Sequence, residues 1–190
     1  MDVTHNLAAL AGRILRPLRA GDEKLAANKE GRLEHAIRLE SPAFADGARI
    51  PDPFAGKDGR SPPLRWSGVP AKARELVLIC EDPDAPLPKP FVHWTVYDVA
   101  PSVTELPEGL PPTGQPLANG AIQGRNSMGR DGWIGPTPPP GHGVHHYHFQ
   151  LFALDGRLDL EAPVDRDKLV EAMRGRVLAT GEIVGTYERK

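Results

Sequence analysis

The sequence predicts a mainly β protein, with an antiparallel β-sandwich-like core and a few peripheral helices, including an N-terminal and a C-terminal one. Its apolar segments are of strand length and are separated at close intervals by turn residues, as in 36–41, 75–81, 91–99 and 182–187. The 20 glycines and 21 prolines are dispersed without a period, which is typical of a loop-rich β protein. Strands do not alternate with helices, as they would in a parallel α/β sheet.

Two segments carry apolar residues at helical spacing. In residues 4–19 these are positions 7, 10, 14, 15 and 18, and Pro17 limits how far the helix extends. In residues 165–179 they are positions 169, 170, 173 and 177, and Gly181 is expected to end the helix. Because residues 20–34 are polar, we expect a helical extension with its connector over 1–35 and a main domain over 36–190.

Composition and charge exclude several classes of partner. The chain has 190 residues and a formal net charge of −2, without the basic runs interleaved with aromatics that mark nucleic-acid-binding surfaces. No apolar run approaches the roughly 18 residues of a membrane span. Cys80 is the only cysteine, so no intramolecular disulfide forms, and the arginine-rich N-terminus shows no signal-peptide cleavage site. We therefore expect a cytoplasmic protein without nucleic-acid partners or an integral membrane segment.

Residues 133–155, WIGPTPPPGHGVHHYHFQLFALD, combine reactive side chains with an enforced backbone shape. The segment begins as a Pro/Gly turn and continues as a strand, and four of the chain's seven histidines fall at the junction. The two-residue period of a strand places His145 and Tyr147 on one face and His146 and His148 on the other. The stretch therefore suggests a small pocket whose rim is the turn.

Two other strand ends carry similar side chains. Asp82 begins the turn DPDAP after an apolar strand, and His93 lies near the start of the strand 91–99. Regular alternation would place His93 on one face of that strand together with Thr95, Tyr97 and Val99. A carboxylate beside an imidazole stabilises the protonated ring, and a phenol adds a donor. With backbone N–H groups of the 135–141 turn, such a set would hold a small oxyanion.

A metal site and a hydrolase are the alternatives that these residues leave open. His146 and His148 share a strand face, but zinc would need one or two more ligands from elsewhere in the chain. A hydrolase would need an activated nucleophile, yet the sequence contains no G-x-S-x-G, and Ser127 has no base placed by its spacing. Both hypotheses are weaker than an oxyanion pocket, and we predict no metal site and no catalytic residues.

Four motifs in order give the chain a family resemblance. SPPLRWSGVP (61–70), DPDAP (82–86), FVHWTVYDV (91–99) and GRNSMGRDGWIGPTPPPGHGVHHYHFQLFALD (124–155) closely resemble the phosphatidylethanolamine-binding proteins, in particular the bacterial Raf-kinase-inhibitor-like branch. The resemblance covers about residues 36–188. It implies two antiparallel sheets with a small ligand pocket at one end. The ligand-binding residues that it implies, with the pocket wall and the flanking tryptophan included, are Asp82, His93, His145, Tyr147, Trp94, Gly135, Thr137 and Pro138.

The resemblance also implies a function. We expect a non-enzymatic protein without a cofactor that binds a small anion, such as phosphate, a carboxylate or a phospholipid headgroup, with His93 and His145 donating to it. A regulator of a kinase or another protein, acting through the pocket rim, is the alternative. Many bacterial members carry a cysteine where this chain has Thr137. Because threonine has a hydroxyl in place of the thiol, we expect no thiol-dependent role at this position. Bacterial members often pair, so we expect a homodimer, with the N-terminal helix as a contact.

Overall fold

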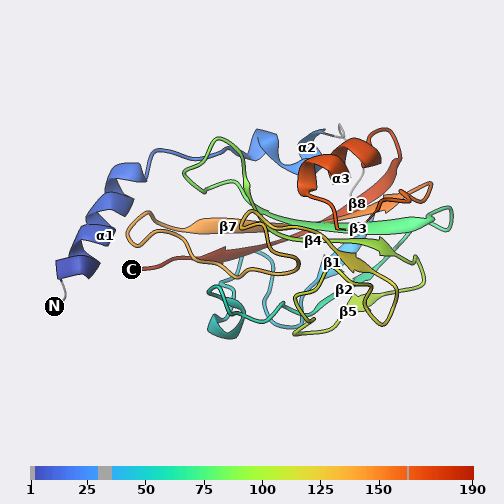
Figure 1. Ribbon diagram of the computed structural model, residues 1–190, viewed down its shortest axis with the longest axis horizontal. Coiled ribbons are helices and arrows are strands. Elements are labelled where there is room, and N and C mark those ends of the chain that lie inside the picture. The colour runs from blue at the N-terminus through green and yellow to red at the C-terminus, as the bar shows by residue number, and fades with distance from the viewer. Residues whose placement is uncertain (1–2, 30–35, 162) are drawn as a thin grey trace.

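The computed structural model describes residues 3–29, 36–161 and 163–190, and it contains two antiparallel sheets (Figure 1). The larger sheet has five strands in the order β6-β4-β3-β7-β8, and the smaller has three in the order β1-β2-β5. The strands are β1 (Arg38–Glu40), β2 (Leu64–Ser67), β3 (Glu75–Asp82), β4 (Phe91–Val99), β5 (Glu105–Leu106), β6 (Ile122–Gln123), β7 (His145–Leu154) and β8 (Val177–Tyr187). The predicted fold class is confirmed.

Both faces of the large sheet are covered, which explains why residues 76–80 of β3 form an unbroken apolar run. One apolar cluster lies between the two sheets and includes Trp66, Leu78, Trp94 and Phe149. A second lies on the opposite face, under α3 (Arg166–Met173), and includes Ile79, Tyr97, Phe152 and Leu169. Complete burial of an aliphatic or phenylalanine side chain stabilises the folded state by roughly 1.5–3 kcal/mol. Successive residues of β3 alternate between the clusters, so every position must be buried.

The C-terminal helix is shorter than predicted, and the prediction that Gly181 ends it is wrong. The Asp165 side chain accepts a hydrogen bond from the Lys168 amide at 3.0 Å and begins α3. The turn after Met173 contains Gly175 at φ 73°, and β8 begins at Val177. Gly181 lies inside β8, where a Cβ atom would overlap the carbonyl oxygen of Ile37. Close backbone approach, and not a helix stop, accounts for this glycine.

The N-terminal helix α1 (Val3–Leu15) stands at one end of the molecule (Figure 1). It confirms the predicted helix but ends before Pro17. The connector returns along the main body through η1 (Asp22–Lys24) and α2 (Ala26–Lys29), with Ala20 N–H donating to Ala85 O at 3.1 Å. Residues 30–35 of the predicted connector lie outside the described residues. A further 3-10 turn, η2, spans Asp52–Phe54. Within the described chain, no helix has the length and apolar character needed to span a membrane.

Strand β4 departs from regular alternation at His93. Cys80 of β3 pairs with Trp94, but the next residue, Glu81, pairs with Val92, so His93 is an extra residue, a β-bulge. Consequently His93 and Trp94 both face the inter-sheet side, where both rings contact Trp133. The predicted shared face of His93 and Tyr97 is therefore wrong, since Tyr97 packs under α3.

Candidate functional site

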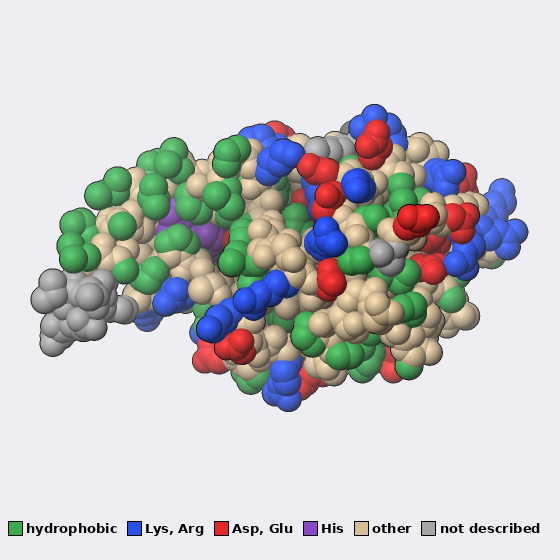
Figure 2. All heavy atoms as spheres, in the orientation of Figure 1, with side chains coloured by type: hydrophobic (Ala, Val, Ile, Leu, Met, Phe, Trp, Pro, Cys, Tyr) green, Lys and Arg blue, Asp and Glu red, His purple; other side chains and the backbone are tan. Residues whose placement is uncertain are grey.

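A cavity of about 380 Å³ opens at the end of the sandwich where β3 ends and β4 and β7 begin. Six of the eight predicted site residues line it: Asp82, His93, Gly135, Thr137, Pro138 and His145. The other lining residues are Lys57, Ala85, Pro86, Leu87, Phe91, Met128, Ile134 and Pro139, most of them apolar. On the face in Figure 2, histidine side chains show next to the apolar side chains of α1. The sandwich thus brings segments that are distant in sequence to one small cavity.

His93 is held in one tautomer. Its Nδ1 lies 2.6 Å from the carbonyl oxygen of Ile134, which only accepts, so Nδ1 carries the hydrogen. Burial lowers the pKa of His93, although the Asp82 carboxylate acts in the opposite direction. The neutral ring therefore keeps a lone pair on Nε2. The bulge in β4 is what turns this ring toward the cavity end of the sandwich.

A chain of three hydrogen bonds runs from the cavity to helix α1. Asp82 Oδ2 lies 2.7 Å from His145 Nδ1, His145 Nε2 lies 2.7 Å from His142 Nδ1, and His142 Nε2 lies 2.9 Å from the Leu15 carbonyl oxygen. Asp82, His145 and His142 are all buried. His142 is not among the site residues predicted from the sequence. Nothing in the sequence pattern marks it, because its partner Leu15 belongs to a separate helix.

The three hydrogen bonds determine how many hydrogens Asp82, His145 and His142 hold together. Each bond needs one hydrogen, and the Leu15 carbonyl supplies none. Two neutral imidazoles carry two hydrogens, so the third bond requires one more proton, shared by the cluster. Asp82, His145 and His142 together are then electrically neutral. Both ring nitrogens of His145 are engaged, so His145 has no N–H left for a ligand, contrary to the donor role expected from the sequence.

Tyr147 lies beneath the cavity and not on its lining. Its ring meets the His93 ring edge-on, with centroids 4.9 Å apart, and its hydroxyl is buried without a hydrogen-bond partner in the described part of the chain. Burial raises the pKa of Tyr147 far above its ordinary value, and the charge of Asp82 adds to this. The phenol therefore keeps its hydrogen and is a donor without an acceptor. Such a buried group costs about 1–3 kcal/mol unless something completes it.

Two predicted residues, Trp94 and Thr137, and one that was not predicted, Lys57, lie around the cavity. Trp94 is fully buried and donates to Gln123 Oε1 at 2.8 Å, so it supports the site from behind the cavity. Thr137 is exposed at the rim and donates to Gly135 O at 3.2 Å. Lys57, from the turn after η2, brings a positive charge to the mouth. Its place in a polar turn carried no signal that could have found it.

The outward face of β7 is occupied by ion pairs. His146 donates to Asp84 through both its amide and its ring, each at 2.7 Å, and Arg19 forms an ion pair with the same carboxylate. Burial raises the pKa of Asp84, but these contacts outweigh burial and lower it overall. His148 pairs with Glu182 at 3.0 Å. In the described ranges, no three His, Cys, Asp or Glu side chains are grouped to hold a metal.

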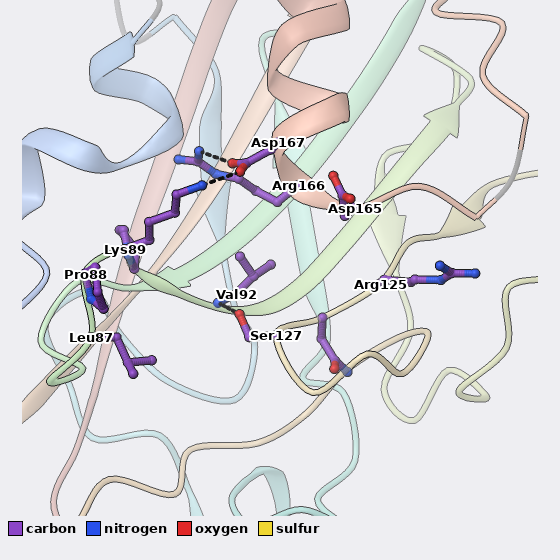
Figure 3. A pocket seen from close by; sticks show the side chains of 11 residues that line it. Leu87, Pro88, Lys89, Val92, Arg125, Ser127, Asp165, Arg166 and Asp167 are labelled. Atoms are coloured by element: carbon purple, nitrogen blue, oxygen red, sulfur yellow. Dashed lines mark hydrogen bonds and ion pairs between the residues drawn. The ribbon is translucent and has the colours of Figure 1, made fainter.

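A second cavity, of about 610 Å³, lies beside the first and shares Leu87 with it (Figure 3). Its charged side chains are largely paired with one another. Lys89 lies 2.7 Å from Asp167, and Arg166 lies 3.1 Å from Asp167 and 2.8 Å from the buried Glu81. The Ser127 hydroxyl accepts the Val92 amide at 2.8 Å. Most charged side chains of this cavity are therefore already paired within the described part of the chain.

The fold and the smaller cavity define a β-sandwich protein with a small polar-floored cavity at one end. The sequence profile described as phosphatidylethanolamine-binding protein matches residues 40–188, so the chain belongs to that family. A UPF0098 protein of Methanothermobacter thermautotrophicus is 44% identical over 155 residues, which are 80% of this chain and 99% of that protein. The profile begins beyond α1, which lies outside the family match.

Solved structures agree with the family. The crystal structure of a putative phosphatidylethanolamine-binding protein homolog from Chlamydia trachomatis matches with a TM-score of 0.73 and 40% identity, over 83% of this chain and 100% of that one. The structure of E. coli YbcL, described as a new member of the mammalian family, matches with a TM-score of 0.71 and 30% identity, over 82% and 99%. The similarity therefore extends over nearly the whole of each relative.

Proposed function

We propose that this protein binds a small oxyacid, free or as a phospholipid headgroup, in the 380 Å³ cavity and catalyses no reaction on it. The observation that carries the proposal is the Tyr147 hydroxyl, which is buried without a hydrogen-bond partner among the described residues, on a ring that packs edge-on against His93. Native proteins rarely bury a donor without an acceptor, and a ligand oxygen would complete it. The family name of its relatives points to the same class of ligand.

The cavity suits an oxyacid that carries both an acceptor and a hydrogen. Tyr147 donates to one ligand oxygen, and the His93 Nε2 lone pair accepts from a protonated one, as in hydrogen phosphate. Asp82 does not repel the ligand, because its oxygens bond the Asp84 amide at 2.8 Å and His145 at 2.7 Å and its charge is balanced within the cluster. Lys57 adds an attractive charge at the mouth.

Isothermal titration calorimetry with inorganic phosphate and phosphoethanolamine tests the proposal. We expect saturable binding of at least one of them, weakened by Tyr147→Phe. Because His93 becomes a donor only below its lowered pKa, a fully ionised anion should bind better at acid than at alkaline pH. Absence of binding to either compound at every pH would refute the proposal, and turnover of generic ester or phosphate substrates would refute its non-enzymatic part.

We further propose that the protein forms a homodimer in which a second copy covers the outer face of α1. Leu7, Leu10 and Ile14 are 61%, 52% and 69% exposed, on the side of the helix opposite Gly12, which packs against Pro140. Three large apolar side chains in one exposed row are typical of an interaction surface. Sedimentation velocity should show a dimer that Ile14→Glu converts to a monomer, and a wild-type monomer at high concentration would contradict this. A cytoplasmic location is also part of the proposal.

A further inference from the structure

Helix α1 rests on the turn that leads to the cavity. Gly12 packs so closely on Pro140 that a Cβ atom would overlap its carbonyl oxygen. A Cβ atom on Gly141, which has φ 76°, would lie 2.7 Å from the carbonyl oxygen of Ala9. The Leu15 carbonyl then accepts from His142 Nε2 at 2.9 Å. The docked helix therefore supplies one end of the hydrogen-bond chain that reaches Asp82.

We propose that docking of α1 and ligand binding in the cavity are coupled through His142 and His145. The inference rests on the proposed function for its ligand. It concerns a helix that lies outside the family match, which begins at residue 40.

The coupling follows from the direction of the hydrogen bonds. While α1 is docked, the Leu15 carbonyl requires a hydrogen on His142 Nε2, which leaves a lone pair on its Nδ1. His145 Nε2–H then donates to that lone pair, and the Asp82–His145 pair must hold a further proton. The docked helix thus keeps the cavity floor neutral.

Undocking removes that requirement. Without the Leu15 carbonyl, His142 can carry its hydrogen on Nδ1 and donate to His145 Nε2, while His145 Nδ1–H donates to Asp82. Two hydrogens now satisfy two bonds, so the cluster stays hydrogen-bonded after losing a proton and becomes negatively charged. An anionic ligand is then repelled. By linkage, a bound anion must favour the docked helix by the same factor.

Among the described residues, the other charged groups near the cluster neither accept from His142 Nε2 nor donate to Asp82. Asp84 is occupied by His146 and Arg19, and Arg16 lies against Gly143 on the outside of the turn. His93 donates to Ile134 and is neutral, as is Tyr147. Lys57 lies at the mouth. The Leu15 carbonyl is therefore the group that decides the tautomer of His142.

A pair of valine substitutions in α1 tests the coupling in the full-length protein. Gly12→Val cannot be accommodated against Pro140 and displaces the helix, whereas Ala8→Val places the same residue at an exposed position of the same helix. Hydrogen exchange should show lost protection of residues 3–15 in Gly12→Val only. The affinity for inorganic phosphate should fall by about 5- to 150-fold in Gly12→Val and remain unchanged in Ala8→Val.

A spectroscopic readout separates this inference from the proposed function. Nitrogen-15 NMR of the imidazoles should show hydrogens on both ring nitrogens of His145 in the wild type and loss of the Nε2 hydrogen in Gly12→Val. If phosphate does not bind the wild type, the ligand assignment fails while the NMR comparison still tests the coupling. His142→Leu breaks the chain without touching Gly12 and should weaken phosphate binding similarly. Unchanged His145 signals in Gly12→Val would overturn the inference.

Discussion

The two neighbouring cavities differ in a way that their sizes do not show. The larger, about 610 Å³, is surrounded by charged side chains that satisfy one another, as Lys89 and Asp167 do at 2.7 Å (Figure 3). The smaller, about 380 Å³, is mostly apolar. Among the described residues, however, the Tyr147 hydroxyl beneath it has no hydrogen-bond partner, and the lining residue His93 uses only its Nδ1 in a hydrogen bond. Unsatisfied polar atoms, and not volume or charge, distinguish the proposed ligand site from a structural ion-pair network. Substitutions at the two cavities should therefore affect stability and binding to different degrees.

The largest effect is expected from Arg166, beside the larger cavity. Glu81 is fully buried and accepts from Arg166 Nε at 2.8 Å, Ala26 N at 2.8 Å and Gln150 Nε2 at 2.9 Å. Arg166→Met leaves the Glu81 carboxylate without a counter-charge. It should therefore lower the free energy of unfolding, measured in urea, by about 3–5 kcal/mol. Arg125→Met, an exposed control, should cost little. A loss of phosphate affinity in folded Arg166→Met would show that the larger cavity also binds the ligand.

Tyr147→Phe should separate stability from binding at the smaller cavity. Removing a buried hydroxyl without a partner should leave the free energy of unfolding unchanged or raise it by about 1 kcal/mol. The affinity for phosphate should fall roughly five-fold, which corresponds to one lost hydrogen bond of about 1 kcal/mol. Tyr187→Phe is the matched control, because its hydroxyl bonds Asp52 at 3.0 Å on the surface. Destabilisation by Tyr147→Phe would mean that the hydroxyl has a partner in solution.

The pKa values of two histidines should be shifted in opposite directions from the ordinary value. Burial lowers the pKa of His93, whereas the bond to Glu182 raises that of His148 despite its burial. Because the pKa of His93 is lower in the folded protein than its ordinary value of 6.5, the protein loses stability as the pH falls from 6.5 toward that lowered pKa. His148 contributes stability that is fully present below 6.5 and lost as pH rises through its raised value. NMR titration of the ring protons checks both, and a His93 midpoint above that of His148 would contradict them.

The smallest effect is expected from Lys57, at the mouth of the smaller cavity. Its exposed charge should contribute roughly 0.2–1 kcal/mol, so Lys57→Ala should weaken phosphate binding by about two-fold and make it less sensitive to salt. Lys72→Ala removes an exposed charge from a turn outside the cavity lining and serves as the control. Equal effects of the two substitutions would show that only net charge matters.

Much of this molecule is determined by its sequence alone. The spacing of apolar and turn residues was enough to predict the sandwich, and the period of two correctly assigned His145 and His146 to opposite faces of β7. The family resemblance implies that Asp82, His93, His145 and the 135–138 turn lie together, and they meet at the smaller cavity. The predictions of the sandwich and of the two faces of β7 succeed because strand periodicity and turn chemistry are local properties of the chain.

The hydrogen-bond partners of the site residues, and the face on which His93 lies, follow only from the tertiary structure. The bulge that turns His93 toward Tyr147 depends on pairing with β3, and alternation read along β4 alone gives the wrong face. His142 matters because Leu15, 127 positions away, presents a carbonyl to it, and that contact leaves His145 without a free N–H. Hydrogen-bond partners and ladder irregularities arise between segments distant in sequence. No local pattern therefore encodes which polar atoms of the site remain unsatisfied.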